Sequence, residues 1–293
     1  QGSVLGPLLF NIYINELLCL PLKARIVGYA DDTSLLYSRK SAEDINGDLQ
    51  QDQNIIVPWF KKHLLHLNID KCTGILYSFK DTEIGRNVKF KFGDRELNKE
   101  ESVKYQGVRI DHKLTWRLHC IELQAKLRKL NYLFYHLKKH MSSRHLKRIY
   151  GPLYESVFNY GIIHWGASKH VKPLKILQNK ACRTILSLNP RTSEQELYSK
   201  MGVKKLDEVY KIRMMMFLFK NKNLFGVHNT ELKTRLRKAD CASDPNWRKE
   251  HARMQGRYQR CRIFNNLPAM CRDERRISVF KELITAHIIE KGT

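Results

Sequence analysis

The sequence predicts an α+β fold in which short strands and a few helices precede a long helical region. Before residue 112, apolar side chains alternate with polar ones in several short runs, which is the period of a half-buried strand. After residue 112, apolar side chains recur every three or four positions, as on one face of a helix. The chain has 293 residues, of which 42% are hydrophobic, so it can form one large domain or two to three smaller ones.

The N-terminal part predicts a helix followed by a β-hairpin. Residues 6–19, GPLLFNIYINELLC, begin with Gly-Pro, which suits a first helical turn, and continue with apolar residues near helical spacing. Residues 24–30 and 33–38 are two short apolar runs rich in strand-forming residues. They predict a hairpin that carries Asp31 and Asp32 at its tip.

A second helix and further strands are expected before the helical region. Ser41 followed by Asp44 resembles a capping box, and an apolar stripe after it predicts a helix. Three strand patterns follow, at residues 73–79, 88–97 and 102–111. In the last of them the alternation slips at Gly107, which predicts a tight turn or a bulge.

The remainder of the chain predicts helices. Basic amphipathic patterns occupy residues 123–137, 145–160 and 172–186, another helical pattern covers 206–220, and a last apolar stripe surrounds 277–284. The Met-Met-Met run at 214–216 is most simply core filling.

Positive charge is concentrated in the helical region. The net charge is +24; residues 1–110 hold 15 Lys/Arg against 14 Asp/Glu, whereas residues 111–293 hold 38 against 15. Such a one-sided excess attracts polyanions and favours nucleic acid as a partner. The alternative is a highly charged surface that serves only solubility.

Cysteine usage and hydropathy indicate a reducing, intracellular setting, in nucleus or cytoplasm. The seven cysteines include no Cys-x-x-Cys pair, and no apolar run approaches the roughly 18–20 residues that cross a bilayer. Cys241, His251, Cys261 and Cys271 are spaced ten apart, but zinc sites usually have close ligand pairs, so we expect four unrelated residues. No signal peptide is recognisable, and a chain that begins with Gln1 suggests a piece of a longer polypeptide.

The adjacent carboxylates at the hairpin tip admit two interpretations. Two neighbouring acids repel each other unless a positive charge lies between them. A divalent ion such as Mg²⁺ removes that repulsion, since it prefers one or two carboxylates together with phosphate oxygens. Asp31 and Asp32 therefore suit phosphoryl transfer, but an ordinary solvated turn also selects Asp.

Four motifs in order decide between these interpretations. They are QGSVLGPLLFNIYINEL, YADDTSLL, LNIDKCTGILYS and VKYQGVRIDHKLTW, beginning at residues 1, 29, 67 and 103. This series resembles the reverse transcriptases of non-LTR (LINE-type) retrotransposons, closest to insect jockey-like elements. FNNLPAM and SVFKEL near the C-terminus resemble the end of that family, so the resemblance covers essentially the whole chain.

The resemblance implies a partial polymerase palm with a primer-grip hairpin at residues 1–112, a helical thumb at 113–190, and a basic helical C-terminal domain at 191–293. It implies RNA-directed DNA polymerase activity, with Mg²⁺ or Mn²⁺ as cofactor. The implied partners are an RNA template, a DNA primer and deoxynucleoside triphosphates, with no membrane.

The resemblance also assigns roles to individual residues. Asp31 and Asp32 would be catalytic metal ligands, and Lys71 would assist the departure of pyrophosphate. The expected substrate or nucleic-acid contacts are Gln1, Gly2, Tyr29, Ala30, Tyr105, Gln106, Gly107, Lys126 and Lys129.

Other roles remain open for several of these residues. Gln1 and Gly2 could be ordinary loop residues, Lys71 a solvated lysine and Tyr105 a core residue of the sheet. Lys126 and Lys129 could lie on a helix face that only contacts solvent. Contact with nucleic-acid phosphates is also possible, because it requires positive charge but no sequence-specific geometry. The chain departs from the family pattern at Gly6, where Ser is usual, and at Gln106, where Leu is frequent; both positions act mainly through their backbone.

Two hypotheses about function follow. In the first, the chain is part of a reverse transcriptase that transfers nucleotides to a primer 3′-OH by two-metal catalysis. In the family, a third metal-binding carboxylate lies on a strand that precedes the segment beginning here with Gln1 and Gly2. We therefore expect this chain alone to be inactive. In the second, it is a non-catalytic nucleic-acid-binding remnant or co-opted protein. A group II intron or telomerase type of polymerase fits the segments after residue 110 less well.

Overall fold

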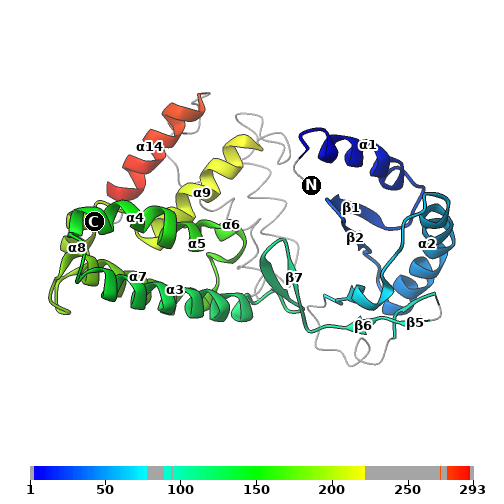
Figure 1. Ribbon diagram of the computed structural model, residues 1–293, viewed down its shortest axis with the longest axis horizontal. Helices are drawn as coiled ribbons and strands as arrows, with labels where there is room; N and C mark the ends of the chain where they lie inside the picture. Colours follow the sequence, from blue (N-terminus) through cyan, green and yellow to red (C-terminus); the bar gives the residue numbers. More distant parts are fainter. Residues whose placement is uncertain (1–2, 78–88, 94, 222–270, 272–275, 291–293) are drawn as a thin grey trace, which may run out of the picture. The chain divides into compact units, whose positions relative to one another are not determined.

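The computed structural model describes residues 3–77, 89–93, 95–221, 271 and 276–290, which fall into two compact units (Figure 1). The first unit is Gln1–Val103 and the second is Lys104–Thr293. Helices and small sheets alternate in the first unit, and helices dominate the second, so the expected α+β class is confirmed at this coarse level. Each described sheet has two strands.

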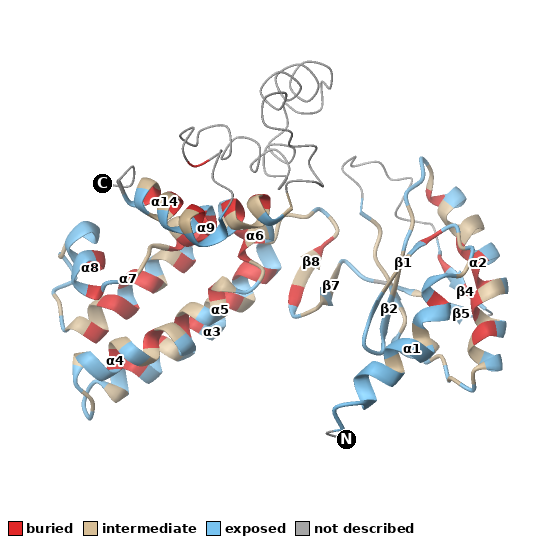
Figure 2. Cartoon of the chain, turned by 90° about the horizontal axis from the view of Figure 1, so that it is seen from above, coloured by how far each residue is buried: buried red, intermediate tan, exposed pale blue. Residues whose placement is uncertain are grey.

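The first unit begins with helix α1 (Gly6–Leu18), as expected from its Gly-Pro start. Strands β1 (Arg25–Tyr29) and β2 (Asp32–Leu36) follow and pair antiparallel. Most of α1 is exposed, and Leu17 is its buried residue (Figure 2).

Helix α2 (Ala42–Lys62) is the long helix of this unit. The Ser41 hydroxyl accepts a hydrogen bond from the Asp44 backbone N–H at 3.1 Å, so the expected cap is confirmed. The helix continues through Pro58 as one element. Its apolar stripe, which includes Leu49 and Ile56, packs against Phe90 and Phe92 to form the core of the unit.

Short elements complete the first unit. They are the 3-10 helix η1 (Ile69–Lys71) and the strands β3 (Thr73–Gly74), β4 (Lys91–Phe92), β5 (Arg95–Glu96) and β6 (Asn98–Lys99). Strands β4 and β5 form the expected hairpin around Gly93, whereas β3 pairs in parallel with β6. The strand expected at 73–79 is thus limited to two of its described residues.

The chain passes from the first unit to the second within strand β7 (Ser102–Tyr105), which forms a hairpin with β8 (Val108–Asp111), and the second unit continues as helices. The helical elements are α3 (Arg117–Leu137), α4 (Ser143–Tyr150), the π-helix η3 (Gly151–Glu155), α5 (Ser156–Asn159), α6 (Ile162–Trp165), η4 (Lys169–Val171), α7 (Lys172–Leu186), α8 (Glu194–Met201), α9 (Leu206–Lys220) and α14 (Ile277–Glu290). Residues 145–160, expected to be helical, run through α4, η3 and α5.

One hydrophobic core extends from Cys120 on α3 to Met214 on α9. It includes the aromatic side chains of Phe134, Tyr150 and Trp165, all at most 1% exposed. The core continues across residue 190, where the sequence suggested a domain boundary. A smaller cluster joins Met215 of the Met-Met-Met run to α14, which confirms that this run fills the core.

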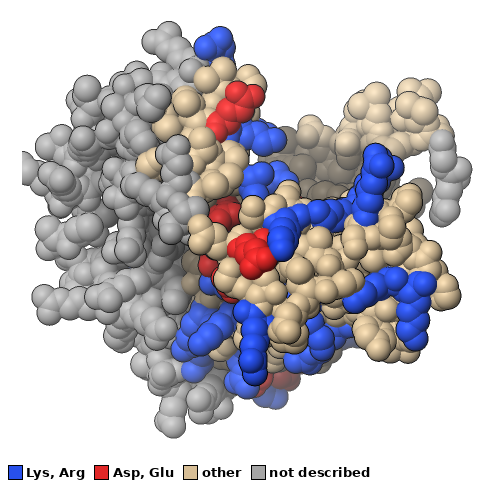
Figure 3. Space-filling model, turned by 90° about the vertical axis from the view of Figure 1, so that its left-hand side faces the viewer, with Lys and Arg blue, Asp and Glu red and all other residues tan. Residues whose placement is uncertain are grey.

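Among the described residues, no helix is both long enough and apolar enough to span a bilayer. Lys and Arg are widely spread over the face shown in Figure 3, with fewer Asp and Glu side chains between them.

Candidate nucleotidyl-transfer site and nucleic-acid surface

The tip of the β1–β2 hairpin brings four of the predicted site residues together. Tyr29 pairs with Asp32 in the register of the ladder, so Ala30 and Asp31 form a two-residue turn. Ala30 has a φ of 50°. A positive φ at the first turn position matches the twist of the flanking strands, although it strains a residue that carries a Cβ.

Both carboxylates at this tip are exposed, and so is Tyr29, whose exposed fraction is 62%. In the part of the chain that the structure describes, neither Asp31 nor Asp32 forms a side-chain hydrogen bond or an ion pair with another residue. Carboxylate oxygens without protein partners are the ligands that Mg²⁺ and Mn²⁺ prefer. The donor set therefore fits a divalent ion, although no group of three or more ligand side chains occurs among the described residues.

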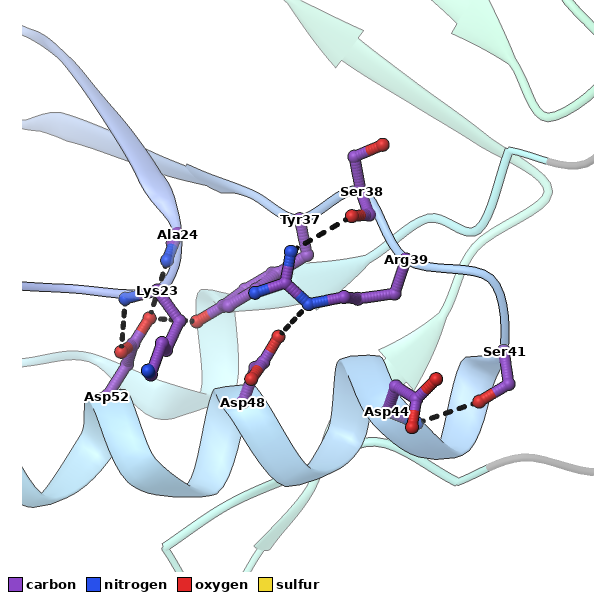
Figure 4. A network of polar contacts seen from close by, with 9 residues as sticks. All are labelled: Lys23, Ala24, Tyr37, Ser38, Arg39, Ser41, Asp44, Asp48 and Asp52. Atoms are coloured by element: carbon purple, nitrogen blue, oxygen red, sulfur yellow. Dashed lines mark hydrogen bonds and ion pairs between the residues drawn. The ribbon is translucent and has the colours of Figure 1, made fainter.

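The base of the same hairpin is fastened to helix α2 (Figure 4). The Asp52 carboxylate, 1% exposed, accepts hydrogen bonds from both sides of the hairpin base. One turn earlier on α2, Asp48 forms an ion pair with Arg39 at 2.6 Å. The hairpin is thus held at its base, whereas the two acids at its tip have no hydrogen-bond or ion-pair partner among the residues that the structure describes.

Lys71 ends the 3-10 helix η1 and is exposed. Its neighbour Asp70 forms an ion pair with Arg95, also at the surface. Lys71 lies in the same compact unit as the two aspartates, and no described hydrogen bond or ion pair joins them.

The β7–β8 hairpin contains the predicted primer-grip residues. Gln106 and Gly107 form a two-residue turn with φ values of 48° and 78°, which confirms the expected tight turn. Tyr105 and Gln106 are half-buried, and Gly107 is exposed. The hydroxyl of Tyr160, in the helical part of the same unit, donates a hydrogen bond to the Gln106 carbonyl oxygen at 2.5 Å.

Polar contacts fasten this second hairpin to the start of α3. Asp111, which is buried, accepts hydrogen bonds from the backbone N–H groups of Thr115 and Trp116 at 2.9 and 2.7 Å. Arg109 forms an ion pair with Glu122 on α3. These contacts fix the direction in which α3 leaves the sheet.

Helix α3 separates apolar from basic residues. Leu123 and Leu127 are buried, whereas Lys126 and Lys129 are exposed. Residues 123–154 contain no Asp or Glu, so exposed lysines here meet no opposite charge from their own segment. This basic surface can attract the phosphate groups of either nucleic-acid strand, whatever the base sequence.

Several predictions fall on residues outside the described ranges. Gln1 and Gly2 lie there, as do Cys241, His251 and Cys261 of the evenly spaced set. Cys271 is described and is buried.

Sequence reasoning missed two residues that shape these sites, Asp52 and Tyr160. Asp52 left a signal, because it lies three residues after Leu49 and four before Ile56, on the apolar stripe of α2. An acidic side chain on the apolar stripe of a helix is buried together with that face of the helix. Its carboxylate then needs hydrogen-bond donors to offset the cost of burial. Tyr160 left no comparable signal, because its partner is a backbone carbonyl 54 residues away.

The family model that matches this chain covers mainly the first of the two units. The model of the family described as "Reverse transcriptase (RNA-dependent DNA polymerase)" matches residues 1–110. Residues 1–110 are thus similar to reverse transcriptases. The Asp31–Asp32 tip and the Gln106–Gly107 turn both lie within this reverse transcriptase segment.

Relatives extend the similarity beyond that segment. The chain is 29% identical over 201 residues to the probable RNA-directed DNA polymerase from transposon BS of Drosophila melanogaster, covering 63% of this chain and 22% of the relative. It is 26% identical over 198 residues to the RNA-directed DNA polymerase from mobile element jockey of the same species, covering 63% and 21%. A third, the probable polymerase from transposon X-element of that fly, is 25% identical over 194 residues, with the same coverage of 63% and 21%.

These relatives confirm the resemblance to the non-LTR, LINE-type reverse transcriptases that the four motifs indicated. The chain spans about a fifth of the length of each relative. No solved structure matches the chain.

Proposed function

We propose that the chain is part of an RNA-directed DNA polymerase of a non-LTR retrotransposon. In this proposal residues 1–112 are a partial palm with its primer grip, 113–190 a thumb, and 191–293 a basic C-terminal domain. The substrates are an RNA template, a DNA primer and deoxynucleoside triphosphates.

The observation that carries the proposal is the pair Asp31–Asp32 on an exposed two-residue turn within the reverse transcriptase segment. In the reaction, the primer 3′-oxygen bonds to the α-phosphorus of the triphosphate and the bond to pyrophosphate breaks. Asp31 and Asp32 would hold Mg²⁺ or Mn²⁺ against the triphosphate oxygens. A divalent ion bound there supplies positive charge for the attacking and leaving oxygens.

Other residues of the chain would bind and orient the substrates. The exposed Tyr29 and the strained Ala30 present backbone and ring next to the acid pair, which suits contact with the last base pair. Lys71 would place a positive charge near the departing pyrophosphate.

The second unit would hold the nucleic acid. Gly107 leaves the tight turn open to a primer backbone, and Tyr105 and Gln106 flank it. Lys126 and Lys129 on α3 would contact phosphates of the template–primer duplex. Gln1 and Gly2 would contact the new base pair, as the resemblance implies.

Binding of Mn²⁺ to the chain tests the acid pair directly. Without the family's third carboxylate the pair should bind weakly, and we expect Mn²⁺ in excess to broaden the backbone amide signals of the β1–β2 tip in NMR spectra. Asp31→Asn and Asp32→Asn should each weaken this binding, because each removes a charged ligand. Asp44→Asn, on an exposed acid of α2, is the matched control and should leave it unchanged.

Primer extension tests the activity in a polypeptide that also includes the family's strand before the Gln-Gly segment. There, Asp31→Asn or Asp32→Asn should lower DNA synthesis on a primed RNA template by roughly a thousandfold, since metal ions contribute several kcal/mol to the transition state. Mn²⁺ binding and extension that both survive the two substitutions would contradict the proposal. RNA binding without any extension would favour the non-catalytic alternative.

A further inference from the structure

The carboxylate of Asp52 is a buried acid that receives three hydrogen bonds. It accepts from the backbone N–H of Lys23 at 2.8 Å, from that of Ala24 at 2.9 Å, and from the Tyr37 hydroxyl at 3.0 Å. Its exposed fraction is 1%. Burial of a carboxylate is costly unless donors surround it, and these three donors offset that cost.

The donors come from the two chain segments at the base of the β1–β2 hairpin. Lys23 and Ala24 directly precede β1, and Tyr37 directly follows β2. A single side chain on α2 therefore holds the chain where it enters the hairpin and where it leaves it (Figure 4).

Tyr37 is kept in the form that this contact needs. Burial, followed by the hydrogen bond and charge of Asp52 and the charge of Asp48, raises the pKa of the Tyr37 phenol above its usual range. The phenol therefore stays protonated and donates throughout the physiological range. We call the contacts of Asp52 with Lys23, Ala24 and Tyr37 the Asp52 clamp; titration of Tyr37 does not weaken it at physiological pH.

The hairpin depends on its base because, among the described residues, its sheet consists of β1 and β2 alone. An isolated two-stranded hairpin is marginally stable in water. Five residues per strand place the tip about 17 Å from the base, at about 3.3 Å per residue. A small rotation at the base therefore becomes a large displacement at Asp31 and Asp32.

We propose that Asp52 is a positioning residue for the acid pair: it fixes the entry and exit of the β1–β2 hairpin on α2 and so sets where Asp31 and Asp32 lie. This inference rests on the proposed function for its consequence, but its structural part stands alone. The ion pair of Arg39 with Asp48 is a weaker second tie, because the Arg39 side chain is 40% exposed.

Three variants separate the parts of the clamp. Asp52→Asn keeps the side-chain volume but replaces one acceptor oxygen with an NH₂ group, which faces a donor. Tyr37→Phe removes only the hydroxyl contact and leaves both backbone contacts in place. Asp44→Asn makes the same chemical change at an exposed position of the same helix and serves as the control.

Hydrogen exchange followed by mass spectrometry measures the local effect. We expect Asp52→Asn to speed exchange at residues 23–37 by about tenfold or more, since the negative charge and at least one of the three hydrogen bonds are lost. Tyr37→Phe should give a smaller increase at the same residues, and Asp44→Asn none. Exchange in the second half of α2 should stay within about twofold of wild type in all three.

Local and global effects are thereby distinguished. Equal acceleration across the whole first unit in Asp52→Asn would show a merely stabilising role and overturn the proposal. Unchanged exchange at residues 23–37 would overturn it as well. If Asp52→Asn does not fold, Tyr37→Phe alone decides: selective acceleration at 23–37 supports the clamp, and none overturns it.

Titration with Mn²⁺ alone links the clamp to the acid pair. We expect Asp52→Asn to weaken Mn²⁺ binding at the tip several-fold while the far-ultraviolet circular dichroism stays as in wild type. If Asp31→Asn and Asp32→Asn leave Mn²⁺ binding unchanged, the proposed function fails and the exchange result still decides on the clamp. If those two weaken binding and Asp52→Asn does not, the positioning role fails alone.

Discussion

The hydroxyl of Tyr160 donates a hydrogen bond to the backbone carbonyl of Gln106, at 2.5 Å. The ring of Tyr160 lies beside Gly107, where an added Cβ would come within 3.3 Å of its Cε1 atom. One tyrosine therefore supports both residues of the β7–β8 turn, although 56% of its surface is exposed.

Removal of this support should loosen the turn. We expect Tyr160→Phe to lower the free energy of unfolding by about 1 kcal/mol, the usual contribution of one hydrogen bond. Gly107→Ala should cost more, about 1–3 kcal/mol, because a φ of 78° and the tyrosine ring both oppose a Cβ. Urea denaturation measures both, and equal stability of Gly107→Ala and wild type would contradict this account.

Two other glycines should respond to alanine in opposite directions. A Cβ at Gly166 would overlap the ring of Tyr210 in the core of the second unit, so Gly166→Ala should destabilise the protein by about 2 kcal/mol or more. Gly47 lies inside α2, and apart from its chain neighbours and the backbone of the same helix no atom lies within 4 Å of an added Cβ. Gly47→Ala should stabilise it by about 0.5–1 kcal/mol, and thermal unfolding provides the comparison.

Acid should weaken the second unit through His119. Burial of this imidazole, opposed by Glu122 and assisted by Lys126 and Arg109, lowers its pKa below the usual value. The folded state then favours the neutral ring, whose Nδ1 accepts from the Arg109 backbone N–H at 3.3 Å. The contribution to stability is complete above the unfolded pKa of about 6.5, and is lost as pH falls from there through the lowered folded value.

Replacement of this histidine isolates its share of the pH dependence. Denaturation at several pH values between 5 and 8 should show a shallower decline toward acid in His119→Gln than in wild type. Gln keeps an acceptor for the Arg109 amide and does not titrate. Parallel pH profiles of the two proteins would show that His119 titrates alike in the folded and unfolded states.

Binding to an RNA–DNA duplex should depend steeply on salt. If the basic face of α3 contacts several phosphates, the logarithm of affinity should fall with the logarithm of salt concentration with a slope of about −3 or steeper. Lys126→Ala and Lys129→Ala should each make the slope shallower by about one. Lys175→Ala is the control, because Lys175 already pairs with Asp207 at 2.6 Å; a flat dependence in wild type would exclude α3 as the binding surface.

Local patterns predicted much of this protein. The hairpin with Asp31 and Asp32 at its tip, the Ser41 cap and the Gly107 turn all follow from residues within a few positions of one another. Turn geometry, capping and periodicity are short-range effects, so the sequence carries them directly. The order of four motifs then indicated a resemblance to reverse transcriptases, which the match of residues 1–110 to the family model confirms.

Long-range pairing was decided only by the tertiary structure. The short parallel pair of β3 with β6 and the continuous core from Cys120 to Met214 depend on contacts between segments far apart in the chain. The partners of Asp52 lie 15 to 29 residues away, and that of Tyr160 lies 54 residues away. A sequence can show that a buried acid needs donors, but packing chooses which backbone groups reach it, because many arrangements satisfy the same local preferences.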